Sequence, residues 1–217
     1  MLKLNLQLFG APGLTSPIRK ETFENLQLNA GIFLTDFNYA SIADATAARA
    51  AIKTAVQAGT SILGCTRGGG TFVATRTIRT PEVDGKRYRY VGDSFVDDVD
   101  ANLSTTLVEV TPAHIKGVLG NADVTTTGKK TTIKLRTAID EADHLTNLCW
   151  VGDIADGRLV LICLYNALNT ADFTLTFTDK GEGTMAAEFH AFQDEVDDYD
   201  YAPFEIVYFD EPDPPTP

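Results

Sequence analysis

The residue types that most often carry catalysis or bind metals are sparse and scattered in this sequence. The histidines, His114, His144 and His190, lie far apart, and none has the neighbouring carboxylates or cysteines of a local metal motif. Glu188 and His190 would share one face of a strand, with Asp194 near its end, so a weak metal site is one alternative. We favour polar surface or interface contacts for all three histidines.

The three cysteines, Cys65, Cys149 and Cys163, are an odd number with no close spacing. That arrangement indicates neither a disulfide framework nor a Cys-x-x-Cys metal or redox motif. We therefore expect buried free thiols, which behave as small apolar side chains in a protein core.

Two glycine-containing stretches invite comparison with phosphate-binding loops, and neither fits. The stretch Gly128–Thr131 reads Gly-Lys-Lys-Thr, whereas a P-loop would need a glycine where Asp123 stands and a serine or threonine where Lys130 stands. A hairpin turn fits this stretch better. The stretch Gly68–Gly70 is followed by a strand pattern and not by the helix start that would bind an anion. It indicates a flexible connection or a close backbone contact between subunits.

The acidic run Asp194–Asp200 has the composition of a calcium loop but lacks its central glycine and closing glutamate. We favour a solvated acidic loop, with a calcium site and a charged contact between subunits as alternatives. The sequence has no Gly-x-Ser-x-Gly, His-Glu-x-x-His or cysteine–histidine nucleophile pattern. It therefore predicts a protein that is not an enzyme and needs no cofactor or metal, with a carboxylate hydrolase as the minority alternative.

The net charge is −12, from 30 acidic and 18 basic residues, and it is unevenly distributed along the chain. Residues 179–217 contain Lys180 as their only base, and their acids account for nearly all of the excess negative charge. Residues 1–178 are close to neutral. Because binding to DNA phosphates requires clustered lysine and arginine, this composition disfavours a surface that holds nucleic acid.

Helix signals are confined to two segments. Residues 41–58 are alanine-rich with apolar residues at helical spacing, and Ser41 or Asp44 can cap the start while Gly59 ends the helix. A shorter helix is expected over Pro112–Leu119. The interior residues of the longer helix are small, so it can lie close against a sheet.

Most of the remaining pattern is typical of short β-strands separated by turn sequences. Arg158–Tyr165 is apolar on both faces and is expected in the middle of a sheet. In Asp172–Thr178 large apolar residues alternate with threonines, which predicts one buried face. The expected fold class is mostly β, a sandwich or barrel with one flanking helix. The expected strands are Thr60–Thr66, Thr71–Ile78, Lys86–Val91, Thr105–Val110, Thr131–Ile139, Asn147–Val151, Arg158–Tyr165, Asp172–Thr178, Met185–Phe192 and Phe204–Phe209.

The two ends of the chain differ from its middle. Near the start, leucines alternate with polar residues, as in an edge strand or in an arm that adds to a neighbour's sheet. Residues 210–217 are rich in proline and acids and are expected to form an extended tail. We divide the chain into an arm (1–13), one β-sandwich domain (14–209) and this tail. No stretch is long enough to span a bilayer or continuous enough for a secretory signal, so we expect no membrane anchor.

Six stretches within roughly residues 60–209 follow one another in an order that is moderately specific to a single protein family. They are Gly64–Phe72, Pro81–Arg87, Gly92–Asp93, Leu107–Pro112, Glu188–Phe192 and Tyr201–Ile206. The order is a strand, a Glu-Val-Asp-Gly turn, a Gly-Asp pair and a Glu-Val-Thr-Pro helix start. Together with the opening Met1–Gly10, these stretches resemble the major tail tube proteins of long-tailed (siphovirus-like) bacteriophages of Gram-positive hosts.

The resemblance implies a β-sandwich subunit flanked by a helix. Six subunits would close a ring, and rings would stack into a hollow tube around a tape-measure protein, with a tail terminator as a further partner. Genomic DNA would pass through without specific binding. The protein would belong to the virion tail, after assembly in the host cytoplasm.

The resemblance also implies contacts between adjacent rings. A long loop between early strands, here Arg79–Leu103, and the terminal arms would reach the next ring. The residues that we assign to such contacts are Leu2, Leu4, Leu6, Leu8, Asp84, Lys86, Arg87, Arg89, Asp93, Asp97, Asp98 and Asp100.

Two physical expectations agree with this hypothesis. A ring-forming sandwich can satisfy its open sheet edges by pairing with copies of itself. A conduit for a polyanion must not hold phosphates, which suits an acidic chain. Two alternatives stay open: the inner tube of a contractile tail or injection apparatus, and a stand-alone β-sandwich module for binding or adhesion.

Overall fold

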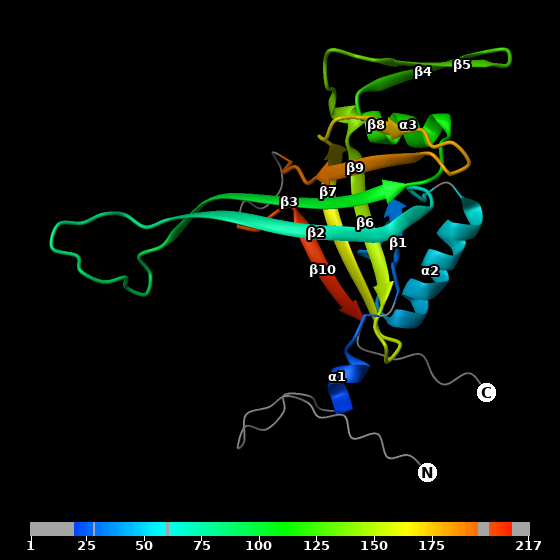
Figure 1. The fold of residues 1–217 in the computed structure, drawn as a ribbon. Coiled ribbons are helices and arrows are strands. Elements are labelled where there is room, and N and C mark those ends of the chain that lie inside the picture. The colour runs from blue at the N-terminus through cyan, green and yellow to red at the C-terminus, as the bar shows by residue number, and fades with distance from the viewer. Residues whose placement is uncertain (1–19, 28, 60, 195–199, 210–217) are drawn as a thin grey trace.

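The fold was obtained as a computed structural model, which describes residues 20–27, 29–59, 61–194 and 200–209. The leucines at positions 2, 4, 6 and 8 and the tail 210–217 lie outside the described residues. The described chain is mostly β, as expected (Figure 1). Its elements are α1 (Lys20–Glu24), β1 (Ile32–Thr35), α2 (Ala45–Ala58), β2 (Thr66–Arg79), β3 (Phe95–Leu107), α3 (Pro112–Leu119), β4 (Ala122–Thr127), β5 (Lys130–Leu135), the 3-10 turn η1 (Glu141–Asp143), β6 (Leu145–Asp153), β7 (Leu159–Asn169), β8 (Thr174–Thr176), β9 (Thr184–His190) and β10 (Phe204–Phe209).

The strands form two layers that share β7. In the first layer, the helix-side layer, the antiparallel strand order is β1-β6-β7-β10, and in the second it is β2-β3-β9-β8. The end of β7 joins the layers, because Leu168 and Asn169 pair with His190 and Phe189 of β9. Figure 1 shows β2, β3 and β9 running across β6 and β7, the arrangement of two sheets packed face to face.

The apolar core lies on both sides of β7. Leu164 packs between the layers with Leu103 and Phe189, whereas Leu161 and Cys163 face the helix α2. Alternate residues of a strand point to opposite faces, so a strand buried on both faces must be apolar throughout. The expectation that Arg158–Tyr165 lies mid-sheet is confirmed.

Both expected helices are present, and local capping explains their bounds. Asp44 caps α2 by accepting a hydrogen bond from the Ala47 N–H at 2.7 Å, and Gly59 ends it in the left-handed conformation at φ 67°. Thr111 caps α3 in the same way, with Pro112 in its first turn. The alanines of α2 let it lie against the helix-side layer, as Figure 1 shows.

Strands β2 and β3 form a long two-stranded ribbon that extends beyond the body of the molecule (Figure 1). Two expectations for this region are wrong. Lys86–Val91 is not a strand but part of the turn at the end of the ribbon, and the expected loop Arg79–Leu103 is strand from Phe95 onward. Glycines with positive φ at positions 85 and 92 turn the chain here. We call residues 80–94 the tip.

Three glycines expected to form a flexible or inter-subunit connection lie inside β2. The register of β2 against β3 shifts between Thr66 and Gly70, and Gly68 and Gly69 take positive φ at this irregularity. Gly70 sits against the Phe33 ring, where a Cβ would lie 2.5 Å from Phe33 Cζ. The close contact is therefore made within the subunit.

Other strand expectations are corrected by pairing between distant segments. The segment expected as Thr60–Thr66 contributes one bridge, Ile62 to Leu34, because residues 61–63 run along the outer side of β1, which the sequence did not predict. A hairpin turn at Gly128 is confirmed, joining β5 to an unpredicted β4. In the expected strand Asp172–Thr178 only β8 pairs. The predicted buried face is confirmed only in part, because Leu175 packs against the core whereas Phe177 is 84% exposed.

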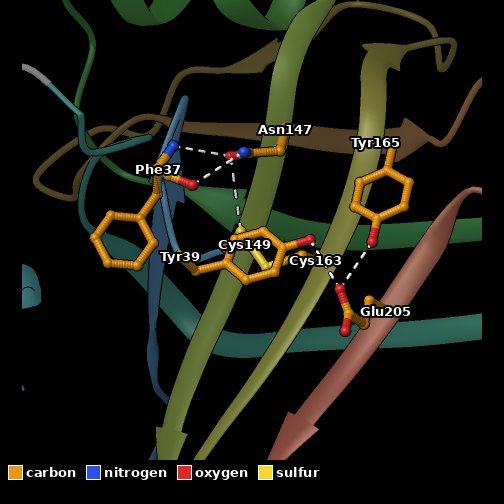
Figure 2. Close-up of a disulfide and its surroundings, with 7 residues drawn as sticks. All are labelled: Phe37, Tyr39, Asn147, Cys149, Cys163, Tyr165 and Glu205. Carbon is orange, nitrogen blue, oxygen red and sulfur yellow. Dashed lines mark hydrogen bonds between the residues drawn. A yellow bond between two sulfur atoms is a disulfide. The ribbon is translucent and has the colours of Figure 1, made fainter. Parts of the chain in front are cut away.

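The expectation of buried free thiols is wrong for all three cysteines, because two of them form a disulfide and the third is exposed. Cys149 and Cys163 stand directly opposite each other on β6 and β7 and form a buried disulfide (Figure 2). The turn between these strands brings together residues 14 positions apart, which spacing alone did not reveal. Cys65 is free and exposed, and its hydrogen bond to the Glu109 carboxylate raises the pKa of the thiol.

Candidate assembly surfaces

The outer face of the second layer carries hydroxyl and amide groups. On β3, residues 101, 103, 105 and 107 are buried, so Asn102, Ser104 and Thr106 point away from the core. Residues directly opposite on neighbouring strands share a face, and Ser104 lies opposite Thr71 of β2 and Glu188 of β9. We call this surface the hydroxyl face; by alternation and register it comprises Thr71, Val73, Thr75, Asp100, Asn102, Ser104, Thr106, Thr174, Thr176, Thr184, Ala186, Glu188 and His190.

The charges on the hydroxyl face are two carboxylates around one imidazole. His190 Nδ1 lies 2.7 Å from Asp100 Oδ1, and His190 Nε2 lies 3.6 Å from Glu188 Oε1. Arg67 borders this face beside Thr71 and Glu188, and its guanidinium group pairs with Glu182. The weak metal site considered for Glu188, His190 and Asp194 does not form, because no group of three or more such ligands able to hold a metal occurs among the described residues.

The two layers end in strand edges of different kinds. The outer side of β1 is covered, since the Thr35 N–H donates to Ser61 O at 3.1 Å and the Leu63 N–H donates to Phe33 O at 3.0 Å. Among the described strands, β2 pairs only with β3, and β10 only with β7. Unpaired donors and acceptors along β2 and β10 are a template for another chain.

Exposed aromatic residues flank β8 at the opposite edge of the hydroxyl face. Phe173 precedes β8 and is 38% exposed, and Phe177 follows it. Large apolar side chains at a strand edge lose contact with water only if another surface covers them. The second layer thus has an open strand at one end and uncovered aromatic rings at the other.

The edge strand β10 is held by a hydrogen-bonded network of two half-buried tyrosines and an exposed glutamate (Figure 2). The hydroxyls of Tyr39 and Tyr165 both donate to Glu205 Oε2, at 3.2 and 2.9 Å. Burial, together with the hydrogen bond to Tyr165, raises the pKa of Tyr39 far above its usual range. Nearby, Asn147 accepts from the Phe37 N–H and donates to its carbonyl, tying β6 to the segment after β1.

The tip is braced by an ion pair between two residues expected to contact the next ring. Lys86 Nζ lies 2.6 Å from Asp93 Oδ2, and the Tyr90 N–H donates to the same carboxylate at 2.8 Å. These contacts, the Lys86 hydrogen bond first, lower the pKa of Asp93 to about 2. Both side chains are largely covered, so Lys86 and Asp93 shape the tip instead of projecting from it.

The remaining predicted contact residues divide into two groups. Asp97 pairs with Arg79 at the base of the tip, and Asp100 pairs with His190. In contrast, no ion pair within the described chain engages the exposed side chains of the residues in the second group, which are Asp84, Arg87, Arg89 and Asp98.

The sequence expectation missed the aromatic part of the tip. Tyr88 is 75% exposed and Tyr90 62%, and Val91 beside them is fully exposed. The aromatic residues of Lys86–Val91 predict a strand, because aromatic and β-branched residues are enriched in strands. Residues 86–91 instead form part of an unpaired turn, so their arginine and tyrosine side chains are exposed on its surface.

Two further observations bear on the class of protein. No helix in the described parts of the chain is long and apolar enough to cross a membrane. A scan against protein-family models matched none of them, and a search of curated proteins found no match. The function must therefore be argued from these surfaces.

Proposed function

We propose that this protein is a non-enzymatic structural subunit of a phage tail tube, which assembles as stacked hexameric rings and forms a hollow conduit for DNA. The observation that carries the proposal is the hydroxyl face, bounded by the unpaired strand β2 at one end and by exposed Phe173 and Phe177 at the other. Copies joined edge to edge would extend this face into a continuous wall.

The chemistry of the hydroxyl face suits the wall of such a conduit. Lysine or arginine facing the bore would bind phosphates, and contacts repeated over many rings would stall the DNA. Threonine, serine and asparagine hydrate well without attracting a polyanion, and Asp100 and Glu188 repel it weakly. The chain as a whole is acidic, with a net charge of −12.

The joining of β2 to the β8 edge is a contact between unlike surfaces. Such a heterologous contact closes into a ring when the rotation between copies fits a whole number of subunits. The number six, the virion-tail location, the assembly in the host cytoplasm, and the tape-measure and terminator partners rest on the resemblance of residues 60–209 to tail tube proteins. The projecting ribbon and the terminal arms would link one ring to the next.

The test is the assembly of the purified protein with one strand edge altered. We expect rings or tubes in negative-stain electron microscopy and a sedimentation coefficient that rises with concentration. Phe177→Asp should leave a folded monomer, because the side chain contributes little to the subunit core, and should block ring formation. Leu135→Asp, at a 62% exposed position on β5 outside both layers, is the matched control and should assemble normally.

The outcomes separate the alternatives. A monomer at every concentration, with no rings or tubes, would contradict the proposal and favour a stand-alone binding or adhesion module, to which the exposed tyrosines of the tip are suited. Rings that form equally well with Phe177→Asp would remove the β8 edge from the interface. The inner tube of a contractile tail or injection apparatus would use the same surfaces, and a sheath protein that binds the tubes would distinguish it.

A further inference from the structure

We propose that the tip of one copy docks into an acidic, aromatic cavity on the body of a neighbouring copy; this rests on the proposed function and names the contact between rings. The cavity has a volume of about 790 Å³ and lies between η1, the facing parts of β6 and β7, and the segment after β9. Thr146 and Asn166 contribute polar groups from β6 and β7.

The cavity combines an aromatic wall with two carboxylates. The rings of His144 and Phe192 meet edge to face with their centroids 5.0 Å apart. Glu141 and Asp194 line the same cavity, are exposed, and form no ion pair within the described chain. Carboxylates beside aromatic rings are a favourable environment for a guanidinium group, which can stack on a ring while pairing with an acid.

The tip presents the complementary groups. Arg87 and Arg89 are exposed without an ion-pair partner among the described residues, and Tyr88 and Tyr90 project beside them. Lys86 and Asp93 neutralise each other, and the exposed acids Glu82 and Asp84 balance the two arginines, so the tip is neutral overall and its uncompensated positive charge is confined to the segment 87–90. Arginine and tyrosine are the residue types that most often dominate binding energy at protein interfaces.

The occupant must come from another copy. Strands β2 and β3 stay paired as far as Arg79 and Phe95. The ribbon therefore holds its tip away from the body that carries the cavity (Figure 1). The tip and the cavity are therefore separate surfaces of one subunit. A contact between unlike surfaces of identical copies propagates from copy to copy, as the growth of a tube requires.

The test is reciprocal charge reversal in the full-length protein. Arg87→Glu with Arg89→Glu, and separately Glu141→Arg with Asp194→Arg, should each shorten tubes at least tenfold in electron micrographs while circular dichroism and melting temperature stay those of the wild type. All four changes in one chain should restore tube length. Lys129→Glu with Lys130→Glu on the β4–β5 hairpin reverses two other exposed cations and should leave tubes unchanged.

A cross-link provides a second measurement that does not depend on charge. In a Cys65→Ser background, Tyr88→Cys combined with Asp194→Cys should give disulfide-linked ladders of subunits on oxidation, and either change alone should not. Tubes of normal length from the Arg87 and Arg89 variant, or no restoration in the fourfold variant, would overturn the docking. So would binding of the tip to DNA or to anionic vesicles in an arginine-dependent way. Failure of the wild type to assemble at all would instead count against the proposed function.

Discussion

A small network of single residues holds the end of the ribbon together. The Asp93 carboxylate pairs with Lys86 and accepts a hydrogen bond from the Tyr90 amide. A carboxylate that accepts several hydrogen bonds is stabilised in its charged form, so its pKa falls. The network organises the turn without any apolar core beneath it. It also orients the arginines at positions 87 and 89 outward, which the proposed contact requires.

The pH dependence of the tip tests this network. The pKa of Asp93 is lowered from 3.8 to about 2, so its stabilising effect is fully present above about pH 4 and is lost as the pH falls through about 2. We expect the Asp93 carboxyl carbon and the Tyr90 amide to titrate together near pH 2 in NMR spectra. Asp93→Asn should abolish the titration of the Tyr90 amide, and a midpoint near 3.8 would show that the Lys86 contact does not form.

The strand β2 is the element on which the fold and the proposed assembly both depend. Its inner face must let the Phe33 ring approach the backbone at Gly70, and its outer edge must stay unpaired in the free subunit. The triple glycine meets the first requirement, because no side chain occupies the space beside Phe33. The projecting ribbon is the continuation of the same strand beyond the core.

Two glycine-to-alanine changes separate a packed position from an open one. At Gly70 a Cβ would lie 2.5 Å from Phe33 Cζ and 2.9 Å from the Ser104 carbonyl oxygen, so Gly70→Ala should lower the free energy of unfolding by about 1–3 kcal/mol. At Gly117 in α3 nothing lies within 4 Å, so Gly117→Ala should be neutral or raise it by up to about 1 kcal/mol. Urea denaturation measures both, and equal effects would contradict the packing at Gly70.

The whole molecule separates its charges by location. One arginine, Arg67, borders the hydroxyl face and pairs with Glu182, whereas other exposed lysines and arginines lie on the tip and on the β4–β5 hairpin, both of which project from the two layers (Figure 1). In the proposed assembly, attraction between the arginines of the tip and the carboxylates of another copy would favour the contact and raise the rate of encounter. In the proposed tube, a neutral to weakly acidic wall would leave DNA free to move.

Adding cations to the hydroxyl face tests its role in the assembled protein. Thr71→Lys with Ser104→Lys places two ammonium groups on adjacent strands of this face. Tubes of this variant should bind double-stranded DNA, with an affinity that falls steeply as salt rises, because counterions are released from the phosphates. Thr71→Gln with Ser104→Gln is the uncharged control of similar size, and binding by neither variant would argue that the face does not meet DNA.

Much of the fold could be predicted because local signals determine it. Asp44 and Gly59 delimit α2, Pro112 begins α3, and Phe204–Phe209 forms β10 within its predicted bounds. The doubly apolar stretch in β7 required a central position whatever its neighbours were. These features depend on capping, propensity and burial of each segment alone.

The candidate surfaces were only partly predictable. The resemblance to tail tube proteins implied a long loop over Arg79–Leu103, but which of its charged residues brace the tip and which have no ion-pair partner depends on the fold of the turn. Alternation predicts that Phe177 is buried on the same face as Leu175, but in the tertiary structure Leu175 packs against the core and Phe177 stays uncovered.

The amino-acid sequence by itself determined the class of the fold, the helices α2 and α3, and the acidic character of the chain. Tertiary structure alone decided that Cys149 meets Cys163, that residues 61–63 cover β1, and that β2 is left with an open edge. The physical reason is that these outcomes depend on which distant strands pair and in what register, and strand pairing is a property of two segments at once.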